Sequence, residues 1–256
     1  MVTLKVFEFG TLSREFVNYV ISILKEFYNL VEDKAPLYVE VYIYEQSLDK
    51  FLVLEKEALE LGVIAVGDFI TLHEAWRGWP RIHIDFEKCA DLHRDILRSL
   101  IIHEAAHSVL HASPIYYVVS IPLDILKDLP IEVAYRILYY ASIAVKDLEV
   151  SQFLYSLNLK DELFNYSKFL EPYIKECMCS NIEDLLELAK LITPFITIGK
   201  DISPLLRIEC RNIAQEIIRI LMKCFKSYKD LDSRVYCLLS NTLSLFESRY
   251  RYYQPS

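Results

Sequence analysis

A chain of 256 residues is long enough to bury a large core, as one domain or as two lobes. With 53% hydrophobic and 13% aromatic residues, the composition is typical of a packed globule and argues against disorder. The net charge of −8, without a block of Lys or Arg, disfavours nucleic acid and anionic membranes as partners. It fits a catalytic domain that acts on small or peptide substrates.

The N-terminus and the apolar runs predict a cytoplasmic protein. The first residues alternate as in a strand and lack the apolar region of a secretory signal. The longest nearly apolar stretch, 109–126, is interrupted by two prolines and an aspartate, so we expect no membrane association. We expect most of the six cysteines to be reduced and buried. The scarcity of Gln favours a thermophilic source, where intracellular disulfides are possible.

The first half of the chain alternates strand and helix patterns. Period-2 alternation or short apolar runs predict strands at 2–9, 37–45, 63–72 and 81–86. Helical spacing predicts helices at 13–30 and 47–61, the second ending at Gly62. Another helix is expected from an N-cap at Asp91 to His111 or Ala112, before Pro114.

The second half has a different character. Four of the five glycines precede residue 80, and from residue 114 onward the patterns are almost wholly helical and separated by prolines. One long helix is predicted over 130–158. The predicted fold class is therefore α+β. An α/β lobe with a small mixed sheet covers 1–113, and an all-helical lobe that closes a cleft covers 114–256.

The sequence His103-Glu104-Ala105-Ala106-His107 lies in the helix predicted after Asp91. Histidines four residues apart stand one turn above each other on the same helix face, so both imidazoles can bind one zinc ion. Glu104 lies on the adjoining face and can reach a water at that ion as a general base. The surrounding residues are apolar, and polar groups buried among them need partners. The pattern therefore predicts a zinc-dependent hydrolase.

This motif, with the order of strands and helices before it, resembles the zincin-type metallopeptidases over roughly residues 1–112. The resemblance implies that His103 and His107 are zinc ligands and that Glu104 is the general base. It also implies that one of the strands 63–72 or 81–86 is the sheet edge along which a peptide substrate lies extended.

A site of this type needs a third protein ligand. The metzincin pattern would place a glycine and a histidine after the motif, where this chain has Leu110 and Ser113. His111 lies roughly 12 Å along an unbroken helix from His103, too far to share one ion. We interpret His111 as a helix-terminal histidine that interacts with the helix dipole or with a zinc ligand.

In the gluzincin type of zincin, the third zinc ligand is a glutamate from a later helix. Glu149 is the candidate that the pattern favours here. Within the helix 130–158 it shares a stripe with apolar and small residues, where a carboxylate needs a partner such as zinc. Glu132 is more simply paired with Arg136 in solvent. Asp147 points away from Glu149 and is expected to be exposed. The other candidates for the third ligand are His111, Glu132, Asp124 and Asp147.

Other polar residues near the motif have simpler explanations. His73 begins a partial copy of the motif, but Arg77 stands where a second ligand would be needed. His83 is expected on a polar surface of its strand or in contact with substrate. A metallopeptidase also needs a donor for the oxyanion. The candidates, none of them preferred, are Tyr116, Tyr117, Tyr135, Tyr139, Tyr140 and Tyr155.

We interpret the chain as a metallopeptidase that uses one zinc ion to hydrolyse peptide or protein substrates. Glu104 would activate water at a zinc held by His103, His107 and Glu149. Two alternatives stay open. One is a zincin fold that binds metal as a regulatory or binding module without turnover. The other is a helical interaction protein in which the motif is accidental.

Overall fold

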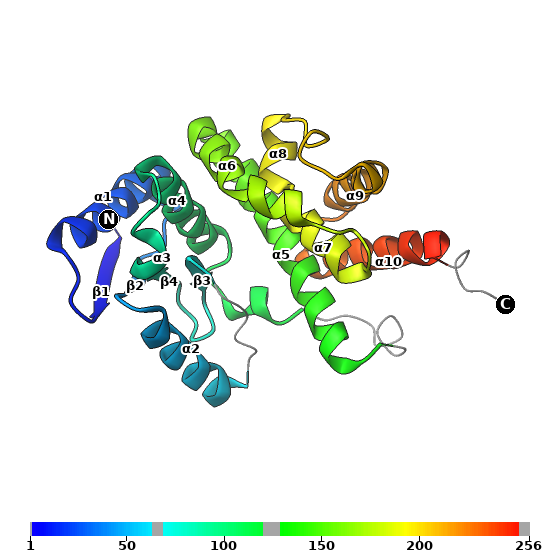
Figure 1. Ribbon diagram of the computed structural model, residues 1–256. Helices are drawn as coiled ribbons and strands as arrows, with labels where there is room; N and C mark the ends of the chain where they lie inside the picture. Colours follow the sequence, from blue (N-terminus) through cyan, green and yellow to red (C-terminus); the bar gives the residue numbers. More distant parts are fainter. Residues whose placement is uncertain (1, 63–68, 120–128, 251–256) are drawn as a thin grey trace. The chain divides into compact units, whose positions relative to one another are not determined.

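The computed structural model describes residues 2–62, 69–119 and 129–250. It divides the chain into two compact units, Met1–Tyr117 and Val118–Ser256 (Figure 1). The boundary therefore falls four residues after the one expected from the sequence, because the short 3-10 helix η2 (Pro114–Tyr117) belongs to the first unit. The α+β class is confirmed, since a small mixed sheet in the first unit is accompanied by many helices.

The first unit contains the predicted alternation of strands and helices. Its strands are β1 (Thr3–Phe9), β2 (Tyr38–Tyr44), β3 (Thr71–Glu74) and β4 (Arg81–Asp85). Its further helices are α1 (Arg14–Val31), η1 (Glu32–Lys34), α2 (Ser47–Leu61), α3 (Phe86–Cys89) and α4 (Arg94–Leu110). Residues 63–68 of the predicted strand 63–72 lie outside the described residues.

The motif helix α4 begins two residues later than predicted. The short helix α3 is capped by Asp85, whose side chain accepts a hydrogen bond from the Lys88 amide. Asp91 therefore lies in the connection between two helices. His93 is the N-cap of α4, and its ring nitrogen accepts from the amide of Asp95. A histidine at this position is outside the usual set of N-cap residues, which explains why the sequence pattern favoured Asp91.

The sheet has the strand order β1-β2-β4-β3. Strands β1, β2 and β4 are parallel, and β3 pairs with β4 in the antiparallel direction. In this last pair Thr71 lies opposite Ile84 and His73 opposite Ile82. Because side chains alternate along a strand, these four residues share one face of the sheet.

The two faces of this sheet are covered by different helices. Helix α4 packs against β3, β4 and α1, over the face that bears Ile82 and Ile84; we call it the α4 face. Helix α2 lies over the opposite face, because its Lys50 forms a buried ion pair with Asp85 of β4. We call this second surface the α2 face. Both faces are buried at β4, whose five residues are all inaccessible to solvent.

The second unit is helical throughout its described residues, apart from the connecting segments. Its helices are α5 (Ile131–Ser156), α6 (Lys160–Glu176), α7 (Ile182–Leu191), α8 (Thr193–Ile198), α9 (Ile208–Ser227) and α10 (Leu231–Tyr250). The long helix α5 packs against α6, α7, α8 and α10 (Figure 1). Within the described part of the chain, no helix is both long enough and apolar enough to span a membrane.

Two disulfides link parts of the helical unit, so the expectation that most cysteines are reduced is wrong. Cys179 is bonded to Cys210, and Cys224 to Cys237. The Cα atoms of the two pairs are 5.8 and 5.6 Å apart, within the range that a disulfide spans. These distances depend on how α9 packs, which cysteine spacing in the sequence does not reveal.

Candidate metal centre

Helix α4 brings the two motif histidines together in a buried position. The Nε2 atoms of His103 and His107 are 3.1 Å apart. The side chains are 3% and 7% exposed. Two nitrogens that bind one zinc ion at 2.0–2.1 Å in a tetrahedral arrangement lie about 3.3 Å apart. The pair therefore has the spacing of two ligands of a single metal ion, and it could hold one.

His111 contacts the second of these histidines through its other ring nitrogen. The Nδ1 atoms of His107 and His111 are 2.9 Å apart and share a hydrogen bond. His111 is the C-terminal cap of α4 and is fully buried, with its ring against Tyr116. Histidines that bind metals commonly hydrogen-bond through the nitrogen that faces away from the metal, which fixes their orientation. His111 is placed to orient His107 in this way.

Glu104 points from the same helix towards the edge of the sheet. Its Oε1 atom accepts a hydrogen bond of 2.9 Å from the hydroxyl of Thr71 in β3. Both side chains are buried, at 8% and 9% exposure. The carboxylate next to the histidine pair is therefore held by a residue that is 33 positions away in the sequence.

A third histidine from β3 lies beside the pair. The ring of His73 stacks on that of His107 with 6.0 Å between centroids and 10° between planes. The hydroxyl of Tyr117 is 2.9 Å from His73 Nδ1. Burial raises the pKa of Tyr117 well above its ordinary value, so this phenol stays protonated. Tyr117 is one of the six tyrosines considered from the sequence, and it hydrogen-bonds to a histidine adjoining the motif.

Sequence reasoning missed Thr71 and His73 as members of this cluster. One signal could have found them: positions 71 and 73 share a strand face, and an edge strand that pairs antiparallel with β4 presents that face to the motif helix. The partial motif at 73–77 instead suggested two positions four residues apart on a helix. The segment is a strand, so the spacing of His73 and Arg77 has no bearing on a metal site.

His83 is buried on the α2 face, and the expectation that it lies on a polar surface is wrong. It is inaccessible to solvent, and its Nδ1 atom is 2.9 Å from the hydroxyl of Tyr44. Its Nε2 atom is 3.1 Å from Glu74 Oε1. Burial lowers the pKa of His83 from its ordinary value, against the opposing effect of Glu74. Arg81 lies in the same cluster and forms ion pairs with Glu74 and Glu57.

The carboxylates considered as third ligands lie on α5 of the helical unit. Glu149 is half-buried and forms an ion pair with Arg234 of α10. Asp147 is 3% exposed, so the expectation that it is exposed is wrong. The sequence reasoning assumed that α5 has a solvent face, whereas almost all residues from 141 to 151 are buried.

Glu132 is exposed at the start of α5. Its expected partner Arg136 forms an ion pair with Glu183 of α7, at 2.7 Å. Asp124 lies outside the described residues.

Comparisons of the chain with protein-family models, with curated proteins and with solved structures found no match.

Proposed function

We propose that the protein is a zinc-dependent metallopeptidase in which His103 and His107 bind the metal and Glu104 is the general base. The observation that carries the proposal is the 3.1 Å approach of the two buried imidazole nitrogens on α4, with a carboxylate from the adjacent residue held at the sheet edge. Ion pairs that only stabilise a fold bring opposite charges together. Two imidazoles that face each other are better explained as ligands of a cation.

We propose Asp147 as the third ligand in preference to Glu149. Both are carboxylates of α5, but Glu149 already has a cationic partner in Arg234. Asp147 is the more deeply buried of the two, at 3% exposure. His103, His107 and Asp147 are all buried. Two histidines and one carboxylate are a ligand set that zinc accepts in hydrolases.

The residues of this chain would then have separate roles in hydrolysis. A bound zinc ion would supply Lewis acidity towards the peptide carbonyl and lower the pKa of water. Glu104 would accept the proton of the attacking water and later pass it to the nitrogen of the leaving amine. His111 would hold the ring of His107 in place. The edge strand β3 would bind an extended substrate through main-chain hydrogen bonds.

The substitution Glu104→Gln tests the peptidase assignment. It keeps the size of the side chain and removes its basicity, so hydrolysis of a mixed peptide substrate should fall about 10²–10⁴-fold. Zinc content, measured by elemental analysis on the same preparations, should not change. Equal rates for wild type and Glu104→Gln, with zinc fully bound in both, would contradict catalysis and leave a metal-binding protein without turnover.

The third ligand can be tested separately with the two α5 carboxylates as matched variants. Asp147→Asn should weaken zinc binding strongly, because the neutral amide loses the charge that the metal needs. Glu149→Gln should bind zinc as the wild type does, although it loses its ion pair with Arg234. Competition with a chromogenic zinc chelator measures both affinities. The reverse order of the two effects would restore Glu149 as the ligand.

A further inference from the structure

Thr71 connects the edge strand to the candidate base. It is the first residue of β3, and its register partner on β4 is Ile84. Its side chain therefore lies on the α4 face, where the hydroxyl donates to Glu104 at 2.9 Å. A β-branched side chain in a strand has few accessible rotamers, so the direction of this hydroxyl is fixed by the backbone of β3.

We propose that Thr71 is a positioning residue that holds the carboxylate of Glu104 in the orientation needed for proton transfer. The inference rests on the proposed peptidase function. A glutamate side chain has three rotatable bonds, and a general base works only when its oxygen is within hydrogen-bond reach of the water that it deprotonates. A carboxylate accepts hydrogen bonds through two oxygens, so one hydroxyl can orient it without occupying both.

The arrangement also couples the base to the strand that would bind substrate. Thr71 and His73 alternate with Leu72 along β3, so both face α4 while the main chain of β3 lies at the end of the strand order. A substrate that extends along this edge would contact the strand whose first residue, Thr71, holds Glu104. The placement of the base and the placement of the scissile bond would therefore depend on one strand.

The pair Thr71→Val and Thr71→Ser tests this role. Valine keeps the branched shape and removes the hydroxyl, so kcat should fall about tenfold while KM and zinc content stay unchanged. Serine keeps the hydroxyl and should restore most of kcat. A change in KM alone, or a Val variant as active as the wild type, would overturn the proposal.

A double-mutant cycle separates this inference from the peptidase assignment. Urea unfolding of Thr71→Val, Glu104→Ala and the double variant should show coupling of about tenfold in the unfolding equilibrium constant. If Thr71 and Glu104 are coupled in a protein that hydrolyses no peptide, their contact exists but has no role in catalysis. That result would overturn both the positioning role and the proposed function. If the protein hydrolyses peptides but Thr71 and Glu104 are not coupled, the positioning role of Thr71 is overturned and the proposed function stands.

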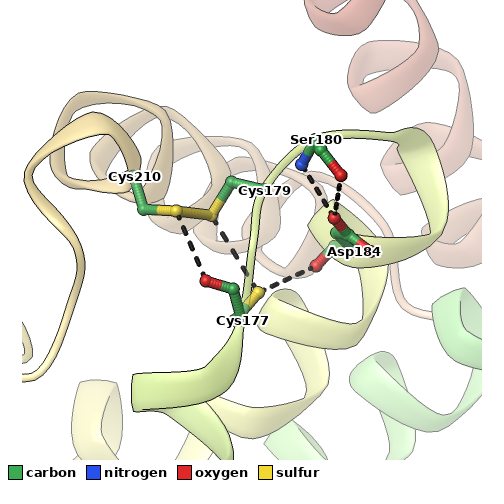
Figure 2. Close-up of a disulfide and its surroundings, with 5 residues drawn as sticks. All are labelled: Cys177, Cys179, Ser180, Asp184 and Cys210. Carbon is green, nitrogen blue, oxygen red and sulfur yellow. Dashed lines mark hydrogen bonds between the residues drawn. A yellow bond between two sulfur atoms is a disulfide. The ribbon is translucent and has the colours of Figure 1, made fainter.

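A second inference concerns three cysteines of the helical unit and is independent of the metal centre. Cys177 ends α6, and its Sγ atom is 3.9 Å from that of Cys179, which is bonded to Cys210 of α9 (Figure 2). The Cys177 thiol also donates to the carbonyl of Asp184, at 3.5 Å. All three cysteines are buried. A third sulfur is thus in van der Waals contact with a disulfide.

We infer that Cys177 exchanges with this disulfide. The Cys177 thiolate attacks Sγ of Cys179, the bond between residues 177 and 179 forms, and the bond between 179 and 210 breaks. Cys210 leaves as a thiolate and takes up the proton that Cys177 released, so the step requires neither oxidant nor reductant. The exchange would release α9 from the segment that precedes α7, because Cys179–Cys210 is the covalent link between them.

Mapping of free thiols in the native protein tests the exchange. The protein is quenched in acid, unfolded and labelled with a maleimide at low pH, where scarce thiolates stop further exchange. Mass spectrometry should find label on Cys210 in a measurable fraction of molecules, with a bond inside the peptide that holds Cys177 and Cys179. Cys177→Ser should show no label on Cys210. Label on Cys210 no higher in wild type than in this variant, or label on all three cysteines, would overturn the inference.

Discussion

The two faces of the sheet in the first unit both bury ionisable side chains, but they combine them differently. On the α2 face each carboxylate of the cluster meets a cation: Arg81 pairs with Glu74 and Glu57, and Lys50 pairs with Asp85. On the α4 face imidazoles gather instead, with the nitrogens of His103 and His107 facing each other.

This difference shows that burial of polar groups does not by itself mark a functional site. A buried network in which charges of opposite sign are matched is explained by the fold. A buried group of imidazoles and one carboxylate, such as the cluster on the α4 face, has the composition of a metal-ligand set. His83 and His103 are both buried residues of one unit, yet we propose a structural role for the first and metal binding for the second.

The largest expected effect is the loss of stability when the ion pairs on the α2 face are removed. Arg81→Met should destabilise the protein by about 3–5 kcal/mol, because it leaves the buried carboxylate of Glu74 without its arginine counter-ion. The matched control is Arg77→Met, since Arg77 also contacts Glu57 but is 35% exposed; it should cost about 1 kcal/mol or less. Urea unfolding measures both. Similar losses for the two variants would mean that the α2 network is not a structural element of the unit.

A smaller effect is expected from the histidine that orients the metal ligand. His111→Phe keeps an aromatic ring beside Tyr116 and removes the nitrogen that bonds to His107. Zinc affinity should fall about 10–100-fold. His93→Asn, at the exposed start of the same helix, should leave the affinity unchanged. A chelator competition in which His111→Phe matches the wild type would contradict the assigned role.

The smallest expected effect is a change in how the free energy of unfolding depends on pH. Burial lowers the folded-state pKa of His83, so the unfolded chain binds more protons once the pH falls below the ordinary histidine value of about 6.5. Stability should therefore decrease as the pH falls from 7 towards the folded-state pKa. One group contributes at most about 1.4 kcal/mol per pH unit. His83→Phe should flatten this slope between pH 7 and 5 in urea unfolding, and parallel slopes would contradict neutral burial of His83.

Features set by local spacing could be predicted from the sequence. Helix α1 begins directly after Ser13, close to the start of the predicted helix 13–30; Gly62 ends α2 in a left-handed conformation, and the motif places His103 and His107 on one helix face. These features depend on residues a few positions apart. Strand β2 could also be predicted from the sequence, because aliphatic residues alternate with Tyr and Glu along the whole strand.

Features set by tertiary packing could not be predicted in this way. The contact of Thr71 with Glu104 requires the antiparallel register of β3 on β4. The burial of Asp147 requires knowledge of what surrounds α5, and the pairing of Glu149 requires the position of α10. A pattern within one helix identifies its apolar stripe but not whether the opposite side is also covered.

The central claim is that the α4 face, and not the α2 face, holds a metal ion. Elemental analysis of protein purified without added metal tests it most directly. We predict about one zinc per chain in the wild type and in His83→Phe, and well below that in His103→Asn and His107→Asn. Sub-stoichiometric zinc in the wild type, or zinc retained equally in His103→Asn, would contradict the account.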